Sequence, residues 1–223
     1  MSKTAKGITA LLVLIFIGIG VIGLFAGYPK FFIEETSVFD TADVQNMQFT
    51  MHSSTIDAFT DPQANSISVS IRGKRQDVRN TKVGVSDGVL SITGVTNLVR
   101  SIDVTVIIPE GTALDCAINV NSGIASLKNL DCESCTVMAN SCAITVDNIN
   151  AANLDISNDN GTISVYKLAG TIHHIKSNFG IMKITDAFGQ ELIVETQSGR
   201  ATIRRIDYDT VTPIGGSGII DIQ

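Results

Sequence analysis

A turn signal recurs every 19 residues through the second half of the chain. Repetition at one fixed period restricts a chain to architectures built from stacked copies of one unit. The turn position is glycine in all copies but one, and its members are Gly123, Cys142, Gly161, Gly180, Gly199 and Gly218. Glycine suits such a turn because positive φ is inexpensive without a Cβ. We therefore predict regular 19-residue coils from about residue 113 to residue 223.

Apolar residues hold fixed places after each turn position. Two residues after it stand Ala125, Ile144, Ile163, Met182, Ala201 and Ile220, and four after it stand Leu127, Val146, Val165, Ile184, Ile203 and Ile222. A spacing of two puts side chains on one face of a strand. One unit cannot bury this face alone, whereas units stacked about 4.8 Å apart form continuous internal rows. The pattern predicts an all-β fold, a single-stranded parallel β-solenoid (β-helix) over residues 44–223, with less regular opening coils before residue 113.

The N-terminal segment is apolar and uncharged over residues 8–27. About 20 residues at about 1.5 Å each span the roughly 30 Å hydrocarbon core of a bilayer, so we predict one transmembrane α-helix. Lys3 and Lys6 precede it, which places a short tail, residues 1–7, in the cytoplasm. Residues 28–43 then form a stalk, and the solenoid lies outside a single-pass cell membrane. A cleaved signal peptide is the alternative, although its apolar region is normally shorter.

Composition narrows the classes of partner. The chain has 16 basic and 22 acidic residues, so nucleic acid and anionic lipid surfaces are disfavoured. It has no Trp and only three Tyr, whereas carbohydrate-binding grooves usually present aromatic platforms. The remaining partners are a protein or the cell wall, in addition to the membrane that holds residues 8–27.

The four cysteines are the most tempting candidates for chemistry, because a C-x2-C pair can begin a zinc site. Cys132 and Cys135 form that pair, but no second one follows. Cys116 and Cys135 both stand seven residues before a turn position, so they should stack in the interior about 4.8 Å apart, which a disulfide permits. Three states of the cysteines remain possible, and in order of preference they are buried free thiols, a disulfide in some pair, and a metal site. His173 shares this row and is expected to be a partly buried histidine with its hydrogen bonds satisfied.

No catalytic, cofactor-binding or metal-binding motif is present. The sequence lacks G-x-S-x-G, H-E-x-x-H and a glycine-rich phosphate loop, so we predict no catalytic residue, cofactor or metal. The alternative is a polysaccharide-active lyase or hydrolase of the β-helix type, which would need clustered carboxylates. Asp147 is flanked in its row by Lys128 and Tyr166, and Asp155 is the other acidic residue we considered. A non-enzymatic role is therefore favoured.

Two surface features complete the repeat. Two residues before the turn positions lies a polar row that could form a ladder of stacked amides, consisting of Asn121, Asn140, Asp159, Asn178 and Gln197. The last coil carries Ile219, Ile220 and Ile222 with Asp221 as the only nearby charge. A strand edge this apolar favours pairing with another chain, so we predict a self-association or partner contact there.

The chain resembles the bacterial putative-adhesin domains of unknown function. The resemblance lies in the segment VTVIIPEGTALDCAINVNSGIASLKNL at residues 104–130 and in the related later segments ISNDNGTISV, KSNFGIMKI and TQSGRATI. These include the LiaG-like membrane-anchored proteins of cell-envelope stress operons. The resemblance implies an extracytoplasmic β-solenoid with an interaction, adhesin-like or envelope-stress role. Cys142 departs from the glycine usual in the family.

Overall fold

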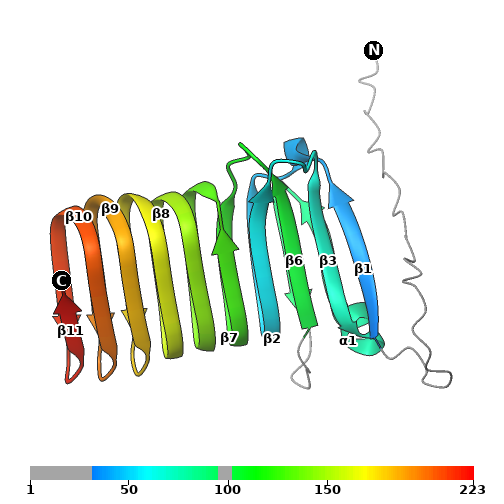
Figure 1. Ribbon diagram of the computed structural model, residues 1–223. Helices are drawn as coiled ribbons and strands as arrows, with labels where there is room; N and C mark the ends of the chain where they lie inside the picture. The colour runs from blue at the N-terminus through cyan, green and yellow to red at the C-terminus, as the bar shows by residue number, and fades with distance from the viewer. Residues whose placement is uncertain (1–31, 95–101) are drawn as a thin grey trace, which may run out of the picture.

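The computed structural model describes residues 32–94 and 102–223, which form one long sheet wound into stacked coils (Figure 1). Its elements are β1 (Phe32–Phe39), η1 (Thr41–Asp43), β2 (Asn46–Asp61), β3 (Ile67–Lys74), α1 (Arg75–Asn80), β4 (Thr81–Ser86), β5 (Val89–Gly94), β6 (Ile102–Pro109), β7 (Asp115–Lys128), β8 (Asp131–Ser177), β9 (Ile181–Thr196), β10 (Arg200–Gly215) and β11 (Ile219–Ile222). Along the stack the strands follow the order β1-β3-β6-β2-β7-β8-β9-β10-β11.

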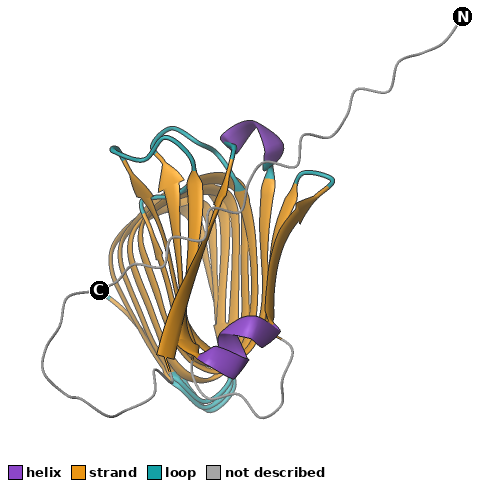
Figure 2. Cartoon of the chain, turned by 90° about the vertical axis from the view of Figure 1, so that its right-hand side faces the viewer, coloured by secondary structure: helices purple, strands orange, loops and turns teal. Residues whose placement is uncertain are grey.

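The coils from β7 to β11 are parallel and keep a 19-residue register. Ile163 is paired with Met182, Met182 with Ala201, and Ala201 with Ile220. The strand β8 passes through more than two coils without a break. Seen along the stack, the coils lie one behind another (Figure 2). The predicted parallel β-solenoid and its period are confirmed in this part of the chain.

The core consists of the predicted internal rows. Ile144, Ile163, Met182 and Ala201 follow one another along the stack and are at most 1% exposed. Burial of an isoleucine side chain contributes about 1.5–3 kcal/mol, and each row repeats that gain at every level. Burial alternates with exposure along each strand, as the spacing of two requires.

The opening strands differ from the predicted parallel coils. The strand β3 is antiparallel to both β1 and β6, and β4 is antiparallel to β5. Among the opening strands, β5 and β6 are parallel to β2, and they pair with its first and second halves, respectively. After β2 the chain forms the strands at the end of the stack. It then returns, and β7 pairs with β2 on the side away from that end. An antiparallel end covers the solenoid core at this side.

Part of the predicted stalk at residues 28–43 belongs to the sheet. The strand β1 pairs with β3 along its whole length, from Phe32 with Lys74 to Phe39 with Ile67. Phe32 and Val38 remain largely exposed at this edge. The predicted transmembrane helix, residues 8–27, lies outside the described residues. Within residues 32–94 and 102–223, no helix has the length and hydropathy needed to cross a membrane.

Candidate functional site

The first corner of each coil is the glycine turn. Gly123 and Gly161 have φ of 130° and 118°. A Cβ on Gly161 would lie 2.1 Å from the carbonyl oxygen of Cys142, in the coil below. Close approach of neighbouring backbones, together with positive φ, therefore explains these glycines.

Cys142 occupies a turn position without a left-handed backbone. Its N–H donates to Asn158 Oδ1 at 3.3 Å, and its carbonyl oxygen accepts from Asn158 Nδ2 at 2.8 Å. The side chain of Asn158 is buried, so it satisfies backbone groups that water cannot reach. The thiol of Cys142 is also buried and lies against the carbonyl oxygen of Val120. The departure from glycine at this coil is thus accommodated by one buried amide.

A second corner lies six residues after each turn position and was missed in the sequence. Its residues are non-glycine and left-handed, with φ between 50° and 56°, and we call them the corner row: Asn129, Asn148, Lys167, Asp186 and Arg205. Asn and Asp adopt this conformation more readily than other residues. The sequence signal for this corner was a polar residue repeated every 19 residues. It did not indicate a left-handed turn, because Lys and Arg are not typical of that conformation.

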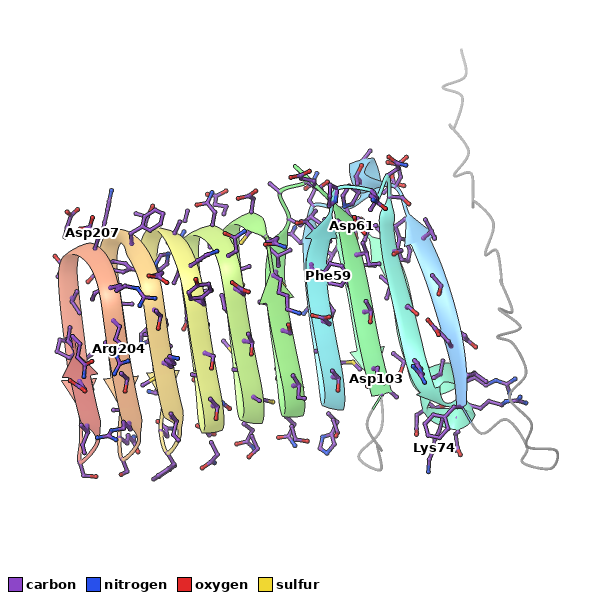
Figure 3. The ribbon with its side chains drawn as sticks, viewed as in Figure 1. Phe59, Asp61, Lys74, Asp103, Arg204 and Asp207 are labelled. Carbon is purple, nitrogen blue, oxygen red and sulfur yellow. The ribbon has the colours of Figure 1, made fainter. Side chains whose placement is uncertain are left out.

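The corner row lines a groove that has a volume of about 840 Å³. The groove runs along the stack from Thr60 in β2 to Asp207 in β10, and Asp207 is labelled at one end of the stack in Figure 3. Buried side chains such as Leu130 and Ile149 form its floor. Phe188 also lines it and is 56% exposed. The groove can therefore receive an extended ligand that has both polar and apolar groups.

Charges of both signs border this groove, with Glu110, Asp131, Asp186 and Asp207 against Lys167 and Arg205. Arg205 donates through Nε and Nη2 to the two carboxylate oxygens of Asp186. This hydrogen-bonded pair lowers the pKa of Asp186, and the nearby charge of Lys167 acts in the same direction. At the other end of the row, Asn148 Nδ2 donates to Asn129 Oδ1 at 2.8 Å. Lys167 has no ion-pair partner among the described residues, and its Nζ lies 5.1 Å from the centre of the Tyr166 ring.

The predicted polar row before the turns forms hydrogen bonds between neighbouring coils. Asn140 Nδ2 donates to Asn121 Oδ1 at 3.0 Å, and Asn178 Nδ2 donates to Asp159 Oδ1 at 2.6 Å. The amide ladder is thus confirmed at these two steps. Asn178 Oδ1 is buried without a hydrogen-bond partner among the described residues, and the amide groups bonded between coils are not free for a ligand.

A second group of charges lies on the outer face of β8 and β9. His174 is 3.5 Å from Asp155 through Nδ1 and 3.7 Å from Glu195 through Nε2, and Lys176 Nζ is 2.9 Å from Glu195. These side chains are partly exposed, and pairs of this kind contribute at most about 1 kcal/mol.

Asp147 is aligned with Lys128, as its row predicted. Within residues 32–94 and 102–223, no three His, Cys, Asp or Glu side chains are placed to hold a metal ion.

His173 is fully buried and bridges three levels of the stack. Its Nε2 is 3.2 Å from the carbonyl oxygen of Ala151, and its Nδ1 is in close contact with the hydroxyl of Tyr208. A neutral ring satisfies both contacts if Nε2 donates to Ala151 and Nδ1 accepts from Tyr208. Burial lowers the pKa of His173 and raises that of Tyr208. The expected hydrogen-bonded histidine is confirmed, but it is fully and not partly buried, and its tyrosine partner was not foreseen.

This pair predicts an acid-sensitive core. Because the pKa of His173 is lower in the folded state than the ordinary value, the unfolded chain takes up a proton first. The stabilisation that comes from keeping His173 neutral should therefore be fully present above about pH 6.5. The free energy of unfolding should fall as the pH drops from there towards the lower pKa of the folded state. Urea unfolding at about pH 7.5 and about pH 5 measures this loss. In the double variant His173→Leu/Tyr208→Phe, which continues the row of Leu154 and Leu192, the loss should shrink. An undiminished loss would assign the acid sensitivity to other groups.

The cysteines and the last coil are placed as follows. Cys116 is aligned with Cys135 across β7 and β8, and the four cysteines are free thiols in the structure.

At the far end, β11 pairs with β10 on one side. Ile219 and Ile222 are largely exposed and Ile220 packs against the core. The self-association expected at these residues stays a prediction.

Comparisons with known proteins support this architecture. A crystal structure of a putative adhesin from Parabacteroides merdae is 14% identical, with a TM-score of 0.52, over 86% of this chain and 96% of that chain. A putative adhesin from Bacteroides fragilis is 14% identical, with a TM-score of 0.44, over 87% and 98% of the two chains. A putative lipid binding protein from Parabacteroides distasonis is 11% identical, with a TM-score of 0.32, over 86% and 96%. At these identities the first likeness establishes the fold alone.

A search of curated proteins found no match. The family model Toastrack DUF4097 matches residues 38–212, a range that takes in both the antiparallel end and the stacked coils described above. A match over most of the chain shows that this chain belongs to the Toastrack DUF4097 family.

Proposed function

We propose that this protein is a non-enzymatic interaction module of the cell envelope, anchored by residues 8–27, whose groove binds an extended segment of a partner protein. The family and the fold support an interaction-type module. The apolar segment at residues 8–27 supports the anchor and the extracytoplasmic position of the solenoid. The envelope-stress role of LiaG-like proteins is the context in which we place it.

The corner row is the observation that carries this proposal. Lys167 and Arg205 adopt the left-handed conformation, which costs about 1–2 kcal/mol for residues other than Gly, Asn and Asp. Asn occupies the same place at Asn129 and Asn148 and would be less costly there. Backbone strain of this kind concentrates at binding and catalytic sites. We infer that the two cations are held at the groove for contact with a ligand.

A peptide suits the groove better than a glycan or an anionic polymer. The groove combines carboxylates, cations, backbone and one exposed aromatic ring, Phe188, which together match the mixed chemistry of a polypeptide. The acidic excess of the whole chain repels an anionic wall polymer. For the alternative polysaccharide-active enzyme, two carboxylates free to act together would be needed. Asp186 is instead paired with Arg205, and Asp155 and Glu195 lie in a surface ion-pair network with His174.

Binding should depend on the two cations of the groove. In Lys167→Asn/Arg205→Asn, the row of asparagines is extended, so the fold is kept while both charges are lost. A photo-crosslinking residue at Asn148 in the full chain should capture a membrane or envelope protein, and the double variant should reduce that capture by about tenfold or more, as expected for loss of two central charge contacts.

The matched control is Lys183→Thr/Arg204→Thr, which also removes two positive charges, but from exposed positions outside the groove lining. Arg204 lies on the outer face of the coil in Figure 3. Capture should be retained in this control. Equal capture by all three proteins, or glycan cleavage by the wild type that Asp155→Ala abolishes, would contradict the proposal.

A further inference from the structure

Three of the four cysteines meet at one corner of the stack. Cys135 is the register partner of Cys116 in the coil below, and Cys132, three residues before Cys135 in its own coil, packs against the same core cluster. Cys116 and Cys135 are register partners across parallel strands, so their Cα atoms are separated by about 4.8 Å. Cys135 and Cys116 are buried, whereas Cys132 is half-buried. The cluster therefore has one member that small molecules can reach and a central member behind it.

The fold brings the side chains of Cys132 and Cys135 together. The equivalent positions two coils later are Gly170 and His173, where a Cβ built on Gly170 would lie only 2.7 Å from His173 Nε2. The two residues between the cysteines are also fixed, because Asp115 Oδ1 accepts the N–H groups of Glu133 at 3.1 Å and Ser134 at 2.8 Å. The backbone between the two cysteines is therefore fixed, and little of its conformational entropy is left to lose when they are linked.

We propose that Cys132 and Cys135 are a redox-active pair that forms an intramolecular disulfide by exchange with a low-molecular-weight disulfide, while Cys116 stays reduced. The Cys132 thiolate attacks the small disulfide, whose S–S bond breaks, so that a mixed disulfide forms and one small thiol leaves. The Cys135 thiolate then attacks the Cys132 sulfur and displaces the second small thiol. Two protein thiols are oxidised, the small disulfide is reduced to two thiols, and the protons of the protein thiols pass to these products through water.

The surroundings set the pH dependence of this reaction. The contact with Cys135 raises the pKa of Cys132, and burial acts in the same direction. The contact with Cys116 likewise raises the pKa of Cys135. The acidic side chains facing the cluster, Asp115 and Asp131, add to the increase. Only the thiolate attacks a disulfide, so exchange should be slow at neutral pH and accelerate as the pH rises.

The test uses the full chain in detergent, incubated with oxidised glutathione over a range of pH. Remaining thiols are then alkylated, and the chain is cleaved after Glu133, which lies between the two cysteines. We expect fragments joined through Cys132 and Cys135, with Cys116 and Cys142 alkylated. The matched control Cys142→Ala, which alters a buried thiol outside the cluster, and Cys116→Ala should form the same link. In Cys132→Ser, oxidation of Cys135 should slow by about tenfold or more because the accessible thiol is lost.

Circular dichroism of each variant shows whether it is folded. Where a variant fails to fold, the positions of linked and alkylated cysteines in the wild-type protein still test the proposal. Glutathione that stays on Cys132 without a following link would overturn the proposal. So would four alkylated thiols in the wild type, a link between Cys116 and Cys135, or a link between two chains.

Discussion

Ile163→Asp should prevent the protein from folding. Ile163 is fully buried in a middle coil, and its register partner Met182 is fully buried as well. A carboxylate at this place would have apolar neighbours on the levels above and below and no cation to pair with. An uncompensated buried charge costs about 3–5 kcal/mol or more, which is comparable with the whole free energy of unfolding of a typical domain. Loss of the β-type circular dichroism spectrum and of soluble expression are the measurements.

The control is the adjacent residue, which the structure places on the opposite face. Thr162 is exposed, so Thr162→Asp should change the free energy of unfolding by no more than about 0.5 kcal/mol. A register slip by one residue would exchange the two faces of the strand. Equal damage from the two substitutions, or greater damage at Thr162, would show that the internal rows are assigned to the wrong face.

The internal rows were predictable because the side-chain period of a strand and the 19-residue repeat are both local properties of the sequence. Ile144, Ile163 and Met182 recur at one place in the unit, and the structure stacks them without change. The turn glycines follow from the same register, and the missing glycine at Cys142 was visible. What compensates for it was not visible, because Asn158 reaches Cys142 from the next coil.

The antiparallel end could not be derived from the same pattern. The strands β3 and β6 alternate apolar and polar residues just as the coils do, and alternation does not reveal the direction of the neighbouring strand. The chain also passes from β2 to the end of the stack before β7 returns beside β2, so sequence order and spatial order differ there. The parallel arrangement predicted for the opening coils is therefore wrong for β3 and β4, whose neighbours are antiparallel.

The groove was missed because its corner is formed by residues of different types. Asn129 and Asn148 are common in left-handed turns, but Lys167 and Arg205 are not, so no single residue type marks the row. Its members are separated by 19 residues and meet only after stacking. The ion pair between Arg205 and Asp186 depends on that stacking in the same way. The site therefore follows from the three-dimensional register, not from a motif.

Gly123→Ala should uncouple the regular coils from the antiparallel end. Gly123 has φ of 130° and is paired with Ser54 of β2, at the junction between the two parts. A Cβ at this position would lie 1.9 Å from the carbonyl oxygen of Ser54, far inside the van der Waals contact distance. Ser54 is also paired with Ile102 on its other side, so β2 has strands on both sides and cannot move away. The backbone of β7 must therefore shift.

We expect this substitution to lower the free energy of unfolding by about 3 kcal/mol or more, since left-handed strain and a backbone clash add together. For a protein of this size that is a decrease in Tm of about 6 °C or more. Thermal unfolding followed by circular dichroism measures it, with Gly84→Ala as the matched control. A Cβ on Gly84 would meet nothing within 4 Å, and Gly84 lies in β4, where alanine fits the backbone. The control should leave Tm unchanged or raise it slightly, because alanine reduces the entropy of the unfolded chain. Similar Tm values for the two variants would mean that β2 and β7 do not approach as closely as the parallel register requires.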